Sequence, residues 1–308
     1  MILSDEDVHA VASAALVLDT MEAAVLEEAQ GALVAPPKFN VATDRGRLTY
    51  TAGASKARFG VNGFRVYSVY PDSEHDTDAT QVVAVFDDHT GVLKGLCVGS
   101  ALGAWRTAGL NGVAVRHLAR EDARVLGVIG AGFQAPYHIG LALAARDFER
   151  IVLTSRTIAK ANALAQRLQE EHDIPVEVVD DADVVAGGVD VLLCTTNSPK
   201  PVFDPAVLRP GTHVNTIGPK FTTRHELSPA VAKVADAFVT DSVAQVMGYG
   251  ERFFLNGHVP LESIVGLGRW IEEGQRRDPE AITVFCSVGL AGTEVCLADA
   301  IMKGHHTL

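Results

Sequence analysis

Cysteine is scarce in this chain of 308 residues. The four cysteines, Cys97, Cys194, Cys286 and Cys296, form no CxxC pair, and each lies in an apolar segment. The pattern therefore excludes a disulfide framework and a cysteine-based zinc site. We expect buried, reduced thiols in a cytoplasmic protein.

Long hydrophobic runs are also missing, since no run reaches the ~18 residues of a membrane span. The N-terminal stretch opens with acidic residues, lacks a basic segment, and is interrupted by Asp19 and Glu22. It therefore predicts neither a signal peptide nor a membrane anchor. Ser4 followed by Asp7 resembles a helix cap, and apolar residues at helical spacing continue to Val25, so this stretch is predicted to be helical.

Positive charge is in deficit. The chain has 26 Lys and Arg against 38 Asp and Glu, a net charge of −12, which argues against nucleic acid or an anionic membrane as a partner. The histidines show no HxxxH spacing, so we predict no metal site. What remains is an ordinary globular composition, 47% hydrophobic, with enough length for two domains.

The chain divides into two parts with different residue patterns. Segments 47–54, 63–71, 80–88 and 91–99 are short, rich in Val, Thr, Tyr and Phe, and separated by Gly, Asp and Pro, which predicts an antiparallel sheet with a hairpin turn at DDHTG. A helix is expected over 102–118. From residue 124 onward, short apolar strands alternate with amphipathic helices, which predicts a doubly wound parallel sheet.

The predicted fold class is therefore α/β, a Rossmann-type sheet with a second α+β domain. We assign residues 119–289 to the dinucleotide-binding domain. Residues 1–118 form the substrate domain, and the last segment, 290–308, is expected to return and pack on it.

The stretch RVLGVIGAGFQAPYHIGLALA, residues 124–144, places a glycine motif between a strand and a helix. Gly130 allows the tight turn, Gly132 lets the backbone approach a phosphate, and Ala135 permits close helix packing. The amide groups and dipole at the new helix N-terminus attract a pyrophosphate. We predict a dinucleotide site, with a purely structural turn as the alternative, formed by Gly130, Ala131, Gly132, Phe133, Gln134 and Ala135.

The end of the next strand bears on which dinucleotide is bound. NAD-selective sites usually carry an acidic residue about 20 residues beyond the first glycine. This chain has Ser155, Arg156 and Thr157 there, whose hydroxyls and guanidinium suit a 2′-phosphate. We expect NADP(H) to be preferred and NAD(H) to be accepted. The alternative is that Ser155 caps the following helix and Arg156 is a solvated charge.

Three polar residues, Thr195, Thr196 and Asn197, follow the strand DVLLC. At the carboxyl end of a parallel strand they are expected over the nicotinamide side of the crevice. Asp241, at a later strand end, is assigned equally to the cofactor site or to a capped turn.

Short motifs spread over nearly the whole chain match those of one known family. They are PPK, GFRVYSVYP, DDHTGVLKGL, GSALGAWRTAGLNGVAVRHLAR and VLGVIGAGFQA, followed by CTTN, IGPKFTTRHEL, VTDS and ITVFCSVGLAGTE. Together they resemble the ornithine cyclodeaminase/μ-crystallin family. The resemblance implies a Rossmann domain paired with a substrate domain that forms a homodimer, and hydride transfer at the α-carbon of a small amino or imino acid.

The resemblance also implies roles for individual residues. Arg106 matches the arginine that holds the substrate carboxylate, a role that its planar fork suits. Lys38 matches a second carboxylate-binding position that is usually arginine. Ser287 and Gly289 match the segment beside the nicotinamide, and Thr107 and Gly218 belong to motifs beside the cofactor. The alternatives are a surface ion pair for Arg106, a solvated loop lysine for Lys38, and a plain strand-to-helix connection for residues 287–289.

The chain departs from the family pattern at three catalytic positions. Arg65 stands where the family usually has a lysine, and arginine cannot transfer a proton at neutral pH. Lys220 stands where the cyclodeaminases have an aspartate, and their glutamate has no counterpart in LTYTAGA. Lys220 could instead point at the cofactor phosphates, and Arg65 could be an outward strand residue.

The functional prediction follows from these departures. Arg65 and Arg106 are the predicted catalytic residues of an NAD(P)H-dependent imine reductase or amino-acid dehydrogenase. Its predicted substrate-binding residues are Lys38, Arg65, Arg106, Lys220 and Gly289. So many cations favour a substrate with two carboxylates, such as iminosuccinate, or with one carboxylate and no basic tail. The alternatives are a non-catalytic protein that binds nucleotide and a small anion, and an ammonia-eliminating ornithine cyclodeaminase.

Overall fold

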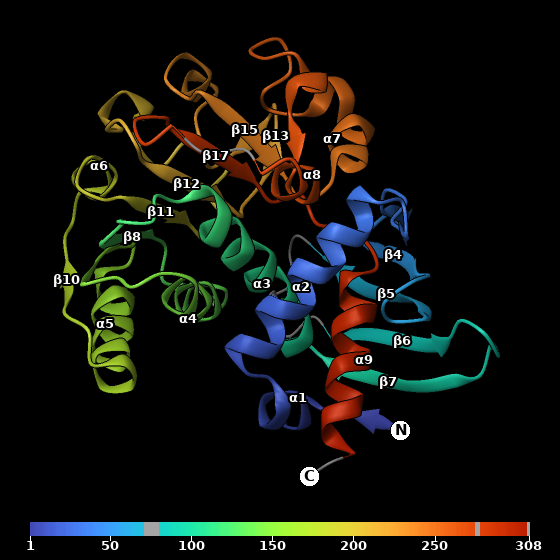
Figure 1. Ribbon diagram of the computed structural model, residues 1–308. Helices are drawn as coiled ribbons and strands as arrows, with labels where there is room; N and C mark the ends of the chain where they lie inside the picture. Colours follow the sequence, from blue (N-terminus) through green and yellow to red (C-terminus); the bar gives the residue numbers. More distant parts are fainter. Residues whose placement is uncertain (71–79, 275–277, 307–308) are drawn as a thin grey trace. The chain divides into compact units, whose positions relative to one another are not determined.

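The structure is a computed structural model that describes residues 1–70, 80–274 and 278–306 (Figure 1). It contains two compact units, Met1–Leu110 with Gly289–Leu308, and Asn111–Val288. We call them the substrate unit and the nucleotide unit. The division falls inside helix α3 (Ala101–Leu118), whereas the sequence places it at the helix end. A change in the residue pattern shows where a helix ends, but it does not show where the packing partners of that helix change.

The substrate unit is built on a seven-stranded sheet in the order β1-β7-β6-β5-β4-β2, with β3 on β4. All its pairs are antiparallel except β1 with β7. This confirms the predicted antiparallel strands, although Pro71 of the second lies outside the described residues. The strands are β1 (Ile2–Leu3), β2 (Leu33–Val34), β3 (Phe39–Ala42), β4 (Arg47–Ser55), β5 (Val61–Val69), β6 (Gln81–Asp87) and β7 (Leu93–Gly99).

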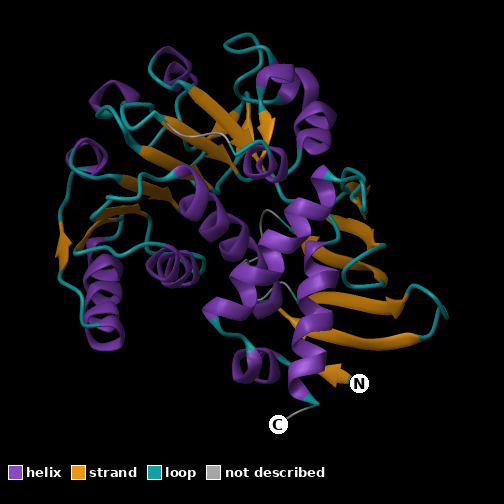
Figure 2. Ribbon diagram, viewed as in Figure 1, coloured by secondary structure: helices purple, strands orange, loops and turns teal. Residues whose placement is uncertain are grey.

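Helices α1 (Asp5–Val11), α2 (Ala14–Ala29) and α9 (Thr293–His305) complete this unit, with α2 and α9 side by side (Figure 2). The predicted cap is confirmed, because Ser4 and Asp7 form a reciprocal capping box. The predicted helical stretch is confirmed as two helices, because the chain breaks before Ser13, which caps α2. Within the described ranges, no helix alone could cross a membrane; α1 and α2 have the length and apolarity only as a pair bent by 93°.

Helix α9 covers one face of the sheet, and the opposite face is apolar. Alternation along each strand sends Thr51 and Arg65 to the α9 side and sends Leu48 and Phe64 to the other. The cross-strand pairs extend that second face from β3 to β7. Its exposed large apolar side chains are Phe39, Val41, Leu48, Phe64 and Val98.

The nucleotide unit contains eight parallel strands in the order β10-β9-β8-β11-β12-β17-β15-β16. The predicted Rossmann-type sheet is thereby confirmed. The strands are β8 (Val125–Ile129), β9 (Arg150–Thr154), β10 (Val176–Val178), β11 (Val191–Cys194), β12 (His213–Thr216), β15 (Ala237–Thr240), β16 (Val265–Gly266) and β17 (Thr283–Cys286). The α-helices are α4 (Ala135–Ala145), α5 (Ile158–His172), α6 (Ala182–Gly187), α7 (Val243–Tyr249) and α8 (Leu267–Glu272). A short hairpin, β13 (Lys220–Phe221) and β14 (Arg224–His225), lies apart.

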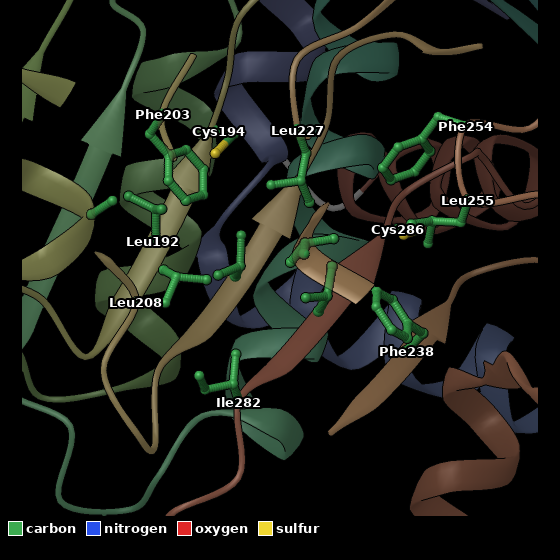
Figure 3. Packing of buried hydrophobic residues seen from close by; sticks show 14 of the residues in the cluster. Leu192, Cys194, Phe203, Leu208, Leu227, Phe238, Phe254, Leu255, Ile282 and Cys286 are labelled. Carbon is green, nitrogen blue, oxygen red and sulfur yellow. The ribbon is translucent and has the colours of Figure 1, made fainter. Parts of the chain in front are cut away.

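Buried side chains from β11, β12 and β17 pack with aromatic residues from the connecting loops (Figure 3). Cys194 and Cys286 belong to this cluster. All four cysteines are buried and unpaired, as predicted. Burial raises the pKa of the Cys286 thiol to about 12. These thiols therefore serve as small apolar groups.

Candidate functional site

A cleft of about 710 Å³ opens at the carboxyl ends of β8, β9 and β11. It lies at the switch point of the sheet, since the chain runs outward from β8 to β9 and β10 and then returns to β11. Nine of the predicted cofactor residues line it: Gly130, Ala131, Gly132, Ser155, Arg156, Thr157, Thr195, Thr196 and Asn197.

Two glycines shape the floor of this cleft. Gly130 has φ +117°, and a Cβ there would lie 2.7 Å from the carbonyl oxygen of Thr195. The Thr195 hydroxyl donates to the Gly130 carbonyl at 3.1 Å, so β8 and β11 meet closely at this point. At Gly132 a Cβ would meet no atom within 4 Å, so the backbone there faces open space. Helix α4 begins three residues later, and its N-terminus can receive a phosphate.

The far side of the cleft carries charges of both signs. Arg156 and Lys160 are exposed cations on its rim, and Asp180 lies opposite them at the end of β10. Thr157, not Ser155, is the N-cap residue of α5, so the predicted alternative of a Ser155 cap does not hold. Lys160 and Asp180 were missed from the sequence. Asp180 could have been found because it follows the end of a predicted strand.

The remaining predicted cofactor residues do not line the cleft. Phe133 is exposed and packs against Tyr137, Gln134 is half-buried, and Ala135, the first residue of α4, is fully buried. The Thr107 hydroxyl donates to the Gly103 carbonyl in its own helix. Asp241 accepts hydrogen bonds from the Val288 amide at 2.8 Å and the Ser287 hydroxyl at 3.2 Å, which ties β15 to the end of β17.

Glu226, which was not among the predicted site residues, holds together the chain beside the cleft. Its carboxylate is fully buried and accepts from the Thr196 amide and hydroxyl at 2.9 and 2.6 Å. It also accepts from the Thr216 hydroxyl and from the amides of Ile217 and Gly218. Gly218 is pressed so close that a Cβ would lie 2.7 Å from this carboxyl group. One carboxylate therefore fixes the ends of β11 and β12. The feature of the sequence that could have pointed to Glu226 is the glutamate of the RHEL motif.

Lys220 is buried beside Glu226. Its ammonium group donates to the Gly218 carbonyl at 2.8 Å and is attracted by the carboxylates of Glu226 and Asp241. Burial lowers the pKa of Lys220, and burial raises the pKa of Glu226 against the opposing pull of Lys220. The charge of Lys220 is thus met within the nucleotide unit.

His138 of α4 is fully buried near Lys220, and neither ring nitrogen has a hydrogen-bond partner among the described residues. Burial, with the charge of Lys220, lowers its pKa from 6.5 to about 3. The unfolded chain therefore binds a proton between these values that the folded chain does not. Stability due to this group is complete above pH 6.5 and is lost as the pH falls toward 3.

We expect His138→Gln to flatten the acid limb of the stability curve. The wild-type unfolding free energy should fall with a slope that His138 steepens by up to about 1.4 kcal/mol per pH unit. Urea unfolding of both proteins at several pH values below 6.5 measures the difference. Equal slopes would show that His138 binds a proton in the folded state.

In the substrate unit, a buried ionic cluster joins three elements. Arg65 of β5, Arg106 of α3 and Glu294 of α9 are 7%, 5% and 0% exposed. The Arg106 Nε lies 3.9 Å from a Glu294 oxygen, and the Thr51 hydroxyl donates to the other oxygen. The predicted alternatives of a surface ion pair for Arg106 and an outward residue for Arg65 are therefore wrong. Glu294 was missed, although the TE pair at the helix start marked its position.

Some donor atoms of this cluster are not used in hydrogen bonds within it. The Nε atoms of Arg65 and Arg106 have no hydrogen-bond partner in the described part of the chain. The Arg65 guanidinium stacks 4.5 Å from the centre of the Tyr67 ring, which holds it in place. Gly289, with φ +91°, carries no side chain to cover Arg106, whose terminal nitrogen would lie 3.6 Å from a Cβ. Lys38 is half-buried in the loop after β2.

The chain thus combines a Rossmann-type unit, with a cleft at the carboxyl ends of its strands, and a second unit that contains two buried arginines. The model of the ornithine cyclodeaminase/mu-crystallin family matches residues 1–305. The chain belongs to this family, as its motifs predict.

Two related proteins with similar sequences are reductases by name. A Delta(1)-pyrroline-2-carboxylate reductase of Bacillus cereus is 34% identical over 253 residues, which cover 78% of this chain and 76% of the relative. An iminosuccinate reductase of Paracoccus denitrificans is 27% identical over 249 residues, which cover 79% and 77%. Among solved structures, Thermococcus litoralis Delta(1)-pyrroline-2-carboxylate reductase in complex with NADH and L-proline has a TM-score of 0.89 at 23% identity, covering 100% of this chain and 98% of that one.

Proposed function

We propose that this protein is an NAD(P)H-dependent oxidoreductase that reduces the C=N bond of a small 2-imino acid to the amino acid, or runs the reverse reaction. The observation that carries the proposal is the buried Arg65–Arg106 pair with its unpartnered Nε donors. Such a pair suits a carboxylate. The nucleotide cleft and the two reductases among the relatives support the same reaction.

In this reaction the imine carbon gains a hydride, the imine nitrogen gains a proton, and the cofactor is oxidised. The nicotinamide, when bound, supplies the hydride. Arg106 would hold the substrate carboxylate and so orient the imine carbon, which is its main contribution. Arg65 stays protonated, so the proton comes from water or from a substrate that binds as the iminium.

The chain's own residues argue against ornithine cyclodeamination. Lys220 replaces the aspartate expected for that activity, and its charge is engaged by Glu226 inside the nucleotide unit. Nothing there would attract a basic ornithine tail.

The test of the proposed imine reduction is oxidation of NADPH and NADH with cyclic imine carboxylates, and with 2-oxo acids plus ammonia. Turnover of an imine supports the proposal. Tight cofactor binding without turnover of any substrate would support the binding-protein alternative.

For the cofactor, we propose that NADP(H) is preferred. Arg156 and Lys160 on the cleft rim carry the charge that a 2′-phosphate requires. We expect the double variant Arg156→Ala, Lys160→Ala to raise the KM for NADPH at least about tenfold, because charge-assisted hydrogen bonds are lost. The KM for NADH should change little. Arg167→Ala on the same helix, away from the cleft, is the control; an equal loss with both cofactors would refute the preference.

We further propose a homodimer that pairs through the apolar sheet face. Phe39, Val41, Leu48, Phe64 and Val98 expose a continuous apolar surface opposite α9. A second copy of this chain fits it, because the family resemblance implies pairing through this unit. We expect Phe64→Glu to yield monomers in sedimentation experiments, whereas Val184→Glu, an exposed apolar site on the nucleotide unit, leaves the dimer intact. A wild-type monomer at micromolar concentration would refute the proposal.

A further inference from the structure

The buried cluster of the substrate unit has an odd charge balance. Two guanidinium groups, Arg65 and Arg106, share one carboxylate, Glu294, and all three side chains are at least nine-tenths buried. Burial opposes the charge of Glu294, but Arg106 and Arg65 outweigh it and hold its pKa below the usual range. The cluster therefore carries one net positive charge at neutral pH.

This charge has no counterion within the cluster. The neutral hydroxyls of Thr51 and Thr293 donate to Glu294, and the Nε atoms of both arginines make no hydrogen bond among the described residues. A buried charge without a counterion is costly. The Arg106 Nε faces Glu294 at 3.9 Å, whereas the Arg65 Nε has neither a hydrogen bond nor an ion pair among the described residues. One unbalanced charge with this open donor matches the carboxylate of a ligand.

The other predicted cations do not add to this charge. Lys220 belongs to the nucleotide unit, where it donates to the Gly218 carbonyl beside Glu226. Lys38 is half-buried, so its charge is partly screened by solvent and is not part of the buried cluster. The sequence predicted four cations; the structure reduces these to a single unbalanced buried charge.

Building on the proposed imine reduction, we propose that Glu294 is a specificity-determining residue that limits the substrate to one carboxylate. The substrate class is then a 2-imino monocarboxylate with an apolar remainder. A dicarboxylate would place its second negative charge near the carboxylate of Glu294, where the cluster's positive charge is already spent. The iminosuccinate expectation from the cation count is thereby replaced.

The experiment compares kcat/KM for Δ1-pyrroline-2-carboxylate with that for iminosuccinate, formed from oxaloacetate and ammonia. We expect the wild type to favour the monocarboxylate by about 100-fold or more, a ratio typical of a desolvated charge mismatch. Glu294→Gln should move the ratio at least about tenfold toward the dicarboxylate. A wild type that prefers iminosuccinate would overturn the proposal, and so would a folded Glu294→Gln variant with an unchanged ratio.

Two variants separate charge from structure. Glu27→Gln removes another buried carboxylate of the substrate unit, one that accepts from the Ser55 hydroxyl and the Arg58 amide. It should leave the substrate ratio unchanged. Thr51→Val removes the hydroxyl bond to Glu294 but keeps the charge, so its ratio should stay near that of the wild type.

Failure of the proposed function would look different. If no imine is reduced, calorimetry with pyrrole-2-carboxylate and with maleate, each in the presence of NADPH, still tests the charge balance. Tighter binding of the monocarboxylate would support the assignment of Glu294. Binding of maleate at equal or higher affinity would overturn it. If Glu294→Gln does not fold, the wild-type ratio alone decides.

Discussion

Arg106→Leu should lower kcat/KM for the imine substrate by about a thousandfold, because truncating one partner of a buried charge pair costs roughly 2–5 kcal/mol. The variant removes the fork that holds the substrate carboxylate and leaves Glu294 with Arg65 as its remaining cation. Arg106→Lys keeps the charge without the fork and should recover part of the loss. Steady-state kinetics with saturating NADPH measure both effects.

The control is Arg116→Leu, the same change in the last turn of α3. It should leave kcat/KM within about threefold of the wild type, as expected for a half-exposed residue outside the cluster. NADPH affinity, measured by fluorescence, should not change in Arg106→Leu, since the cleft belongs to the other unit. If Arg106→Leu keeps more than about a tenth of the activity, Arg106 does not hold the substrate carboxylate.

Local pattern was sufficient for most of the fold. Alternating Val, Thr and Tyr predicted β4 to β7, and the glycine motif between an apolar run and a helix predicted β8 and α4. These elements are defined by neighbours a few residues apart, which a periodicity captures. The break before Ser13 was missed because apolar spacing continues across it, while the serine cap that starts α2 acts over one turn.

The candidate site was less predictable, because its key contacts join distant parts of the chain. Glu294 and Thr51 are separated by 243 positions, and no spacing rule connects them. The charge of Lys220 could not be assigned either, since pairing with Glu226 depends on how a hairpin folds back. Residue type revealed the cations, and only the fold revealed which carboxylates balance them. The number of cations therefore does not by itself give the positive charge available to a substrate, and the predicted dicarboxylate preference stays a prediction.

Glu226→Gln should destabilise the nucleotide unit by about 3 kcal/mol or more, the usual effect of breaking a buried charge network. The carboxylate accepts five hydrogen bonds, three from amides and two from hydroxyls. A glutamine would turn an NH2 group toward some of these donors and remove the negative charge that attracts the buried ammonium group of Lys220. Urea unfolding measures the loss. Glu177→Gln, an exposed residue of the same unit, should cost less than about 0.5 kcal/mol.

Adding Lys220→Met to Glu226→Gln tests whether the charge pair is the cause. If the uncompensated ammonium group accounts for much of the loss, the double variant should be more stable than the sum of the single variants predicts, by about 1–3 kcal/mol. NADPH affinity should be as low in the double variant as in Glu226→Gln, because in both proteins Thr196 and Gly218 lack the carboxylate that fixes them. Additive losses would instead mean that Glu226 acts through its amide and hydroxyl donors, and that Lys220 is stabilised by the Gly218 carbonyl and its other neighbours.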